Sequence, residues 1–231
     1  MTFWRPSRPR LLVVTAVEAE QAAVRRGLGI PVDREDSLGH GDRIVVEAGG
    51  VGSANAAASA AWLLGIPFEA DPFHLVVSMG VAGGFDGRAD LGAAVLASRS
   101  VAADLGAASP EGFLPLDELG FGSSTAEADP DVLASLREAL PKAVVGEVLT
   151  VSTVTGTADR VAALLARHPE AVAEAMEGFG VATAASRAGA AFAELRTISN
   201  PVGPRDRESW RLTEALAALE AAAGALANLI V

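Results

Sequence analysis

Two glutamates stand out as the residues of this sequence with the clearest capacity for chemistry. Glu20 follows closely on an apolar run, and Glu177 lies beside Met176 in an Ala-Met-Glu-Gly-Phe segment. A carboxylate can deprotonate water, accept hydrogen bonds from sugar hydroxyls or stabilise a growing positive charge. Glu177 alone is typical of a solvated acid in the first turn of a helix, so a functional role needs further residues beside it.

Other common catalytic groups are missing from the sequence. It contains no Cys, which excludes disulfides, thiolate catalysis and Cys-based metal sites. Its 3 His residues show no metal-ligand spacing, and neither a Walker loop nor a nucleophile elbow occurs. We therefore expect no metal and no cofactor, and a chemistry carried by carboxylates.

Small and polar residues follow the predicted strands, at residues 17–20, 49–52, 80–84, 153–156 and 200–203. In α/β sheets, ligands bind beyond the carboxyl ends of the strands. Glycines there let the backbone approach a ligand closely, although any single one is as readily explained by a tight turn. We expect the ligand site at this edge of the sheet.

Residues 48–55, Ala-Gly-Gly-Val-Gly-Ser-Ala-Asn, imitate a dinucleotide-binding fingerprint between a strand and a helix. Asn55 stands where the third glycine of the fingerprint would fall. The acid that should end the following strand is also missing, since that strand ends Ser-Met-Gly-Val-Ala-Gly-Gly. The pattern therefore disfavours a dinucleotide cofactor.

Short apolar runs alternate with longer helix-like stretches, and these elements must position the site. Strands are predicted at residues 11–17, 43–48, 73–79, 93–97, 146–152 and 193–199, and helices at 18–27, 53–64, 130–140, 158–168, 174–188 and 207–229. Most strands are continuously apolar, as expected when both faces of a sheet are covered. The pattern predicts an α/β fold, a single-domain three-layer α/β/α arrangement with a central mixed, mainly parallel sheet.

Three segments lie outside this simple alternation. Residues 1–10 are predicted to be a frayed N-terminus, with residues 11–231 forming the domain. Residues 104–127 have little periodicity and are predicted to be a long functional or mobile loop. The Ala-rich end of the chain, from residue 214, is predicted to be a packed or subunit-facing helix.

Charge and hydropathy limit the partners. The 231 residues carry a formal net charge of −11, and a protein this acidic repels phosphate backbones, so no nucleic-acid partner is expected. No apolar run reaches the roughly 18 residues needed to span a bilayer, so no membrane partner is expected. The basic start resembles a signal peptide only briefly, because Glu18 and Glu20 interrupt its apolar run. The cytoplasm is the expected compartment.

Six segments occurring in order resemble the nucleoside phosphorylase/nucleosidase superfamily. They are TAVEAE, EAGGVGSANAA, VSMGVAGG, VSTVTG, AMEGF and RTISNPVG, and the resemblance spans residues 11–210. The chain is similar to methylthioadenosine/S-adenosylhomocysteine nucleosidases and, more closely, to the futalosine hydrolases of menaquinone biosynthesis. This resemblance implies a nucleoside phosphorylase-like domain that hydrolyses the N-glycosidic bond of a small-molecule purine nucleoside.

The resemblance implies a role for each matching residue. Glu20 matches the glutamate that activates water, and Met176 and Glu177 match the pair that holds the ribose. Asn200 matches the residue that faces N7 and the 6-substituent of the purine. The base pocket is implied to be lined by Gly83, Gly84, Val154, Thr155 and Gly156.

The chain departs from adenine-directed nucleosidases at two positions. They carry Asp where this chain has Asn200, and a second Glu where it has Ala175; the register of Glu174 is shifted, so no role is assigned to it. An amide can donate to O6 of hypoxanthine, which an ionised carboxylate cannot. We therefore expect an inosine-like substrate such as futalosine.

Futalosine carries a carboxylated tail on its 5′ side, and Arg205 or Arg207 could bind that carboxylate through bidentate contacts. Local Arg–Asp pairs at the start of a helix explain these two cations equally well. Whether Arg205, Arg207 or neither of them binds the tail of the substrate therefore stays open.

Two other functions stay open as well. A purine nucleoside phosphorylase shares the fold, although the acidic residues 17–20 disfavour a phosphate beside them. A non-catalytic nucleoside-binding protein is the other alternative, because a fold alone does not give a function. The resemblance also implies a homodimer or higher homo-oligomer, in which a partner's loop from residues 104–121, with Phe113 as its aromatic, closes the pocket.

Overall fold

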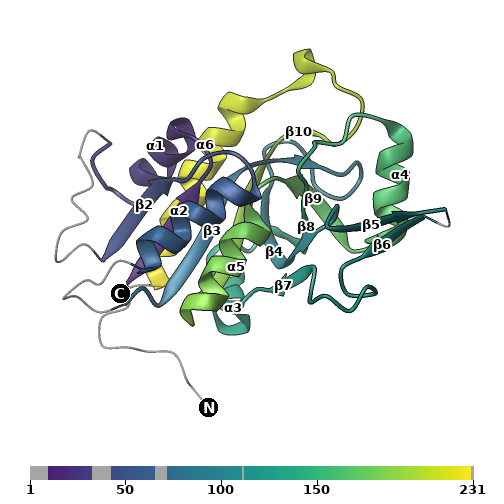
Figure 1. Cartoon of the computed structure of the whole chain (residues 1–231). Helices are drawn as coiled ribbons and strands as arrows, with labels where there is room; N and C mark the ends of the chain where they lie inside the picture. Colours follow the sequence, from purple (N-terminus) through teal and green to yellow (C-terminus); the bar gives the residue numbers. More distant parts are fainter. Residues whose placement is uncertain (1–9, 33–42, 66–71, 111, 230–231) are drawn as a thin grey trace.

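The computed structural model describes residues 10–32, 43–65, 72–110 and 112–229, and Figure 1 shows a twisted sheet flanked by helices. The strands are β1 (Leu11–Thr15), β2 (Ile44–Ala48), β3 (Leu75–Gly84), β4 (Ala94–Ala102), β5 (Gly106–Ser109), β6 (Gly112–Pro115), β7 (Thr125–Glu127), β8 (Val144–Thr150), β9 (Ala171–Ala175) and β10 (Ala191–Pro201). The helices are α1 (Glu18–Gly27), α2 (Ser53–Gly65), α3 (Pro130–Ala139), α4 (Ala158–Arg167), α5 (Gly178–Ala188) and α6 (Leu212–Ala223), with 3₁₀ turns η1 (Arg207–Ser209) and η2 (Gly224–Leu229). Of the predicted frayed N-terminus, residues 1–9 lie outside the described part, whereas Arg10 is buried.

The sheet is mixed, and most of its neighbouring strands are parallel. β1 pairs in parallel with β2 and β3, β3 with β10, and β8 with both β4 and β9. The β10–β4, β4–β7 and β3–β9 pairs are antiparallel. Because β3 pairs with β1, β10 and β9, the strands β3, β10, β4, β8 and β9 close into a ring of pairings. This closure brings the carboxyl ends of β3, β9 and β10 to one place.

Helices cover both faces of the sheet, which explains the continuously apolar strands. Leu11 and Val13 of β1 belong to a core cluster with residues of α1 and α6, whereas Leu12 and Val14 belong to a cluster with residues of α2 and α5. In Figure 1, α2 and α5 lie side by side in front of the sheet, and α1 packs beside α6. Alternate side chains of one strand thus fill two different cores, and both must be apolar. The predicted fold class is confirmed.

The prediction for residues 174–188 was wrong at its first turn. Residues Ala171–Ala175 form β9, between β8 and β3, and α5 begins only at Gly178. The sequence Ala-Val-Ala-Glu-Ala has helix-favouring composition, but pairing with two strands overrides local preference. The consequence for the site is that Glu174 and Ala175 lie on a strand and Glu177 lies at the N-cap of a helix.

Two further predictions missed local breaks in the chain. The aperiodic loop predicted at 104–127 contains the β5–β6 hairpin and β7, strands too short for hydrophobic periodicity to show. The helix predicted at 207–229 is divided into η1, α6 and η2. Its central part packs as predicted, with Leu219, Ala222 and Ala223 in the core beside α1. Within the described residues, no helix is both long and apolar enough to cross a membrane.

Candidate active site

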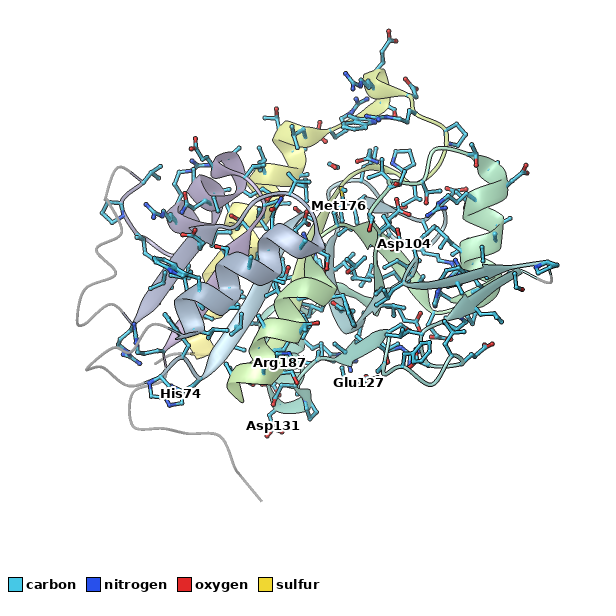
Figure 2. All side chains as sticks on the ribbon, viewed as in Figure 1. His74, Asp104, Glu127, Asp131, Met176 and Arg187 are labelled. Carbon is cyan, nitrogen blue, oxygen red and sulfur yellow. The ribbon has the colours of Figure 1, made fainter. Side chains whose placement is uncertain are left out.

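A cavity of about 280 Å³ lies where the carboxyl ends of β1, β3, β8, β9 and β10 meet. Most of the predicted site residues line it, namely Glu20, Gly83, Val154, Thr155, Met176, Glu177, Asn200 and Arg205. Gly84, Gly156 and Arg207 are not among its lining residues. In Figure 2, Met176 lies at the end of α5 that faces this edge of the sheet, and Arg187 lies at the opposite end of the helix.

Glu20 is held at the cavity by backbone hydrogen bonds. Its Oε2 accepts from the N–H groups of Ala16 at 2.8 Å and Val17 at 3.3 Å, and its Oε1 accepts from the N–H of Val81 at 2.8 Å. Glu20 lies in the first turn of α1, where an acid also favours the helix dipole. A carboxylate offers about four lone-pair sites, so capping the helix leaves Oε1 able to contact a ligand.

Glu177 is held by two segments far apart in the sequence. Its Oε1 accepts from the N–H of Gly52 at 3.1 Å, and its Oε2 contacts the Arg196 guanidinium at 3.2 Å. Gly52 has a φ of 92°, a conformation that favours glycine. The segment that imitates a dinucleotide fingerprint thus supplies a backbone donor to Glu177, and its glycines serve that turn.

Arg196 and Glu194 form a buried charge network behind the cavity that sequence reasoning missed. Arg196 is fully buried, donates to Glu194 at 2.8 Å and to Ser78 at 2.8 Å, and binds Glu177. Ser100 donates a short hydrogen bond to the other oxygen of Glu194. The available signal was an Arg two residues from a Glu in a strand without other charged residues, a spacing that places both side chains on one face. The network fixes Glu177 from behind, so Arg196 is a positioning residue.

The network also sets the protonation of the acids. Burial raises the pKa of Glu20; the Val81 N–H and the charge of Arg196 oppose this rise, and the charge of Glu177 adds to it. Burial would lower the pKa of Arg196, but the three neighbouring carboxylates, Glu194 above all, outweigh it and raise the pKa overall. Arg196 therefore stays charged, and Glu20 is a stronger base than an exposed glutamate.

Asn200 presents an amide whose orientation follows from its neighbours. Its Nδ2 donates to the carbonyl of Pro201 at 3.0 Å, and a carbonyl can only accept, so this end must be the NH₂ group. Its Oδ1 accepts from the hydroxyl of Ser199 at 2.8 Å. A Cβ placed on Gly83 would lie 3.3 Å from Nδ2, so the amide nitrogen lies over this glycine. Nδ2 retains a second N–H for a ligand.

Two of the three predicted glycines, Gly83 and Gly84, have different roles. Gly83 lines the cavity, where the missing side chain leaves room beside Asn200. A Cβ on Gly84 would instead lie 2.8 Å from Cγ2 of Ile198 and collide with the carbonyl of Ala89. Gly84 is therefore required by close packing of the backbone, and it does not line the cavity.

The two predicted arginines also differ. Arg205 lies at the cavity mouth, with its guanidinium 5.6 Å from the centre of the Trp210 ring. Arg207 begins the 3₁₀ turn and is exposed. The aromatic ring holds the Arg205 cation beside the opening through a cation–π contact.

Glu174 is a further cavity residue, to which sequence reasoning assigned no role. It accepts hydrogen bonds from both the backbone N–H and the hydroxyl of Thr155. Burial raises its pKa, and the two bonds from Thr155 oppose that rise. With Glu20 and Glu177, it makes three buried carboxylates on one small cavity.

This arrangement suits a reaction in which positive charge develops on a bound neutral molecule. Two buried acids can stabilise a cationic transition state, and one of them can deprotonate water. The amide of Asn200, at the end of β10, can hydrogen-bond a leaving group that gains negative charge.

Comparisons with known proteins agree with this geometry. A sequence model described as the phosphorylase superfamily matches residues 35–231. The chain is 50% identical over 226 residues to futalosine hydrolase of Streptomyces coelicolor, covering 95% of this chain and 96% of the relative. It is 45% identical over 222 residues to futalosine hydrolase of Acidothermus cellulolyticus, covering 93% and 89%. The solved structure of a 5′-methylthioadenosine/S-adenosylhomocysteine nucleosidase from Colwellia psychrerythraea in complex with adenine has the same fold, with a TM-score of 0.79, 22% identity and 96% of each chain covered.

Proposed function

The chain belongs to the phosphorylase superfamily, and from that premise we propose that it hydrolyses the N-glycosidic bond of futalosine to hypoxanthine and dehypoxanthine futalosine. The observation that carries this proposal is a single cavity that holds Glu20, Glu177 and Asn200 together. The identity to futalosine hydrolases over nearly the whole chain supports the substrate.

The sugar half of the reaction uses the two acids. Cleavage of an N-glycosidic bond passes through an oxocarbenium-like transition state, in which positive charge grows on the ribose. Glu20 takes a proton from the attacking water. Glu177 binds the 2′- and 3′-hydroxyls through Oε1, where the bond from Gly52 leaves one lone pair free, because Oε2 already accepts from Arg196 and from the N–H of Met176. Both carboxylates also stabilise the cation.

The base half of the reaction uses Asn200. Negative charge grows on the leaving purine, and the free N–H of Nδ2 donates to O6 or N7. Ser199 and Pro201 hold the amide before the substrate binds, so no reorganisation is needed in the transition state. A neutral amide suffices because hypoxanthine is a better leaving group than adenine.

A substrate panel tests the proposal. Futalosine, 6-aminodeoxyfutalosine, inosine and methylthioadenosine are incubated separately with the protein, and free base is measured by chromatography. The expected result is hypoxanthine from futalosine at the highest kcat/KM. Binding of futalosine without release of base would instead indicate a nucleoside-binding protein.

The rate of base release should depend on the protonation of Glu20. The base form of this carboxyl is the active one, so kcat/KM is expected to fall as the pH drops through its pKa. Because burial raises that pKa, the fall should begin above the range of an ordinary glutamate with a pKa of 4.5. A pH–rate profile measures this limb; activity that stays constant down to the ordinary glutamate range would count against Glu20 as the base.

Recognition of the 5′ tail is assigned to Arg205 in preference to Arg207. Arg205 lines the cavity mouth and stacks on Trp210, whereas Arg207 is exposed outside it. We expect Arg205→Ala to lower kcat/KM for futalosine by roughly 10-fold or more, the scale of one lost charge-assisted hydrogen bond, and to leave inosine hydrolysis nearly unchanged. Arg207→Ala is the matched control and should affect neither substrate. Equal losses on futalosine and inosine in Arg205→Ala would remove the tail assignment.

A homo-oligomer is also part of the proposal, with residues 104–121 of one copy placed near the cavity of another. Phe113 packs under the Arg167 guanidinium of its own chain, at 4.3 Å, whereas Phe121 is 79% exposed. Phe121 is therefore the better aromatic for a partner contact. Light scattering on wild type and Phe121→Ser tests this, with dissociation expected in the variant.

A further inference from the structure

Glu174 is a buried acid on the cavity wall that the proposed mechanism does not use. Glu174 lies on β9, is only 5% exposed and lines the cavity. Burial of a carboxylate is costly unless hydrogen bonds compensate. An acid retained at such a place, beside the residues that would hold the base, calls for a ligand-related explanation.

The contacts of Glu174 change what this wall offers to a ligand. The backbone N–H of Thr155 donates to Oε1 at 2.7 Å, and the Thr155 hydroxyl donates to Oε2. Both donors of Thr155 are thereby used. The carboxylate has about four lone-pair sites, and the two bonds from Thr155 occupy only two of them. The wall therefore presents acceptors where a free backbone N–H would have presented a donor.

Strand register places this acceptor across from the amide of Asn200. Gly83 of β3 is paired with Glu174 on one side and with Asn200 on the other. Directly paired residues point to the same face of a sheet, and two strand spacings separate the outer pair by no more than about 10 Å between Cα atoms. Gly83 has no side chain, so a slot remains between an acceptor on β9 and the donor Nδ2 on β10.

The two kinds of purine present opposite groups to such a slot. A 6-oxopurine has acceptors at O6 and N7 and a donor at N1–H. A 6-aminopurine has a donor on its 6-substituent and an unprotonated acceptor at N1. An acceptor facing N1 of a 6-aminopurine leaves two acceptors opposed in a buried site, which is unfavourable.

We propose that Glu174 is a specificity-determining residue whose carboxylate accepts the N1–H of a 6-oxopurine while Nδ2 of Asn200 donates at O6 or N7. The proposal rests on the proposed function for the location of the base. It adds the reason for base selectivity. Thr155 orients the Glu174 carboxylate, and this carboxylate gives the cavity wall hydrogen-bond acceptors in place of the Thr155 N–H donor.

Binding of free bases to the whole protein tests the proposal directly. Titration calorimetry with hypoxanthine and adenine is carried out on wild type, Glu174→Gln and, as a matched control, Glu147→Gln. Glu147 is also a buried glutamate, but it pairs with Arg99 away from the cavity. In Glu174→Gln, the backbone N–H of Thr155 holds the only oxygen, so the amide NH₂ takes the place of Oε2, where it can donate to the Thr155 hydroxyl and present its second N–H to the slot.

Wild type and Glu147→Gln are expected to bind hypoxanthine more tightly than adenine. Glu174→Gln should lose roughly 10- to 100-fold in hypoxanthine affinity, the scale of a hydrogen bond to a charged group, while adenine binding is retained or improved. An unchanged ratio of the two affinities in Glu174→Gln, or an equal loss for both bases, would overturn the proposal.

A second measurement changes the ligand instead of the protein, so it does not depend on the folding of a variant. 1-Methylhypoxanthine lacks the N1–H, and wild type should bind it at least roughly 10-fold more weakly than hypoxanthine; equal binding would overturn the proposal. The proposed function fails separately, if wild type releases no base from futalosine. If wild type releases hypoxanthine from futalosine but Glu174→Gln keeps the wild-type preference for hypoxanthine over adenine, only the role of Glu174 is overturned, and the proposed function stands.

Discussion

Replacing Glu20 with Gln is expected to lower kcat/KM for hypoxanthine release by roughly a hundred- to ten-thousand-fold, the range lost when a general base is removed. The amide keeps the shape of the side chain, but its single oxygen can accept either from Ala16 or from Val81, since these two donors bond different oxygens of the carboxylate. It cannot take a proton from water, and it carries no charge to stabilise the ribose cation. Steady-state kinetics on futalosine measures the loss.

The neighbouring Glu18 provides a matched control, because it lies in the same first turn of α1 but is exposed. Glu18→Gln should retain the activity of wild type. Thermal unfolding and futalosine binding, measured on both variants, separate a lost base from a lost fold. If Glu20→Gln binds substrate and releases base within about threefold of the wild-type rate, Glu20 is not the base.

The second large effect is expected from Arg196→Met. Arg196 is the cation at the centre of the network with Glu177 and Glu194, and its removal leaves these buried carboxylates without a charge partner. Breaking a buried ion pair from one side costs about 3–5 kcal/mol. For a chain of this size, the expected change is a drop of roughly 6–20 °C in Tm.

The same substitution should alter the surviving activity. The charge of Arg196 opposes the burial that raises the pKa of Glu20, so its loss should move the acid limb of the pH–rate profile to higher pH. Arg26→Met is the control, since the Arg26–Glu220 pair is largely exposed and contributes less than about 1 kcal/mol. A Tm within a few degrees of wild type for Arg196→Met would contradict the structural role of the network.

Much of the fold is predictable from the sequence because its signals are local. The run at Leu11–Thr15 is apolar at its first four positions, and the structure buries it between two helical layers. The Asp129-Pro130 pair marks the start of α3, where the aspartate side chain accepts from two backbone N–H groups. β9 was missed because its residues favour a helix, and only its pairing with β8 and β3 makes it a strand.

The site also contains residues that the sequence predicts and contacts that it does not. Glu20 and Glu177 follow strands, and Asn200 lies at the end of β10; the carboxyl ends of these strands converge, and the order of the three residues along the chain matches a known pattern. The contacts of Glu174 with Thr155 and of Glu177 with Gly52 join residues far apart in sequence. Such partners follow from sheet closure, which no local pattern encodes. Gly84 and Gly156 show the converse, since a position that matches the family pattern can lie outside the cavity lining.

Attack by water activated at Glu20 is tested most directly by the rate of hypoxanthine release from futalosine in buffer with and without phosphate. The expected result is stoichiometric release at the same rate in both buffers, with no sugar phosphate formed and with the rate of Glu20→Gln strongly lowered in each. Release that requires phosphate and yields a sugar phosphate would identify phosphate as the nucleophile and contradict hydrolysis.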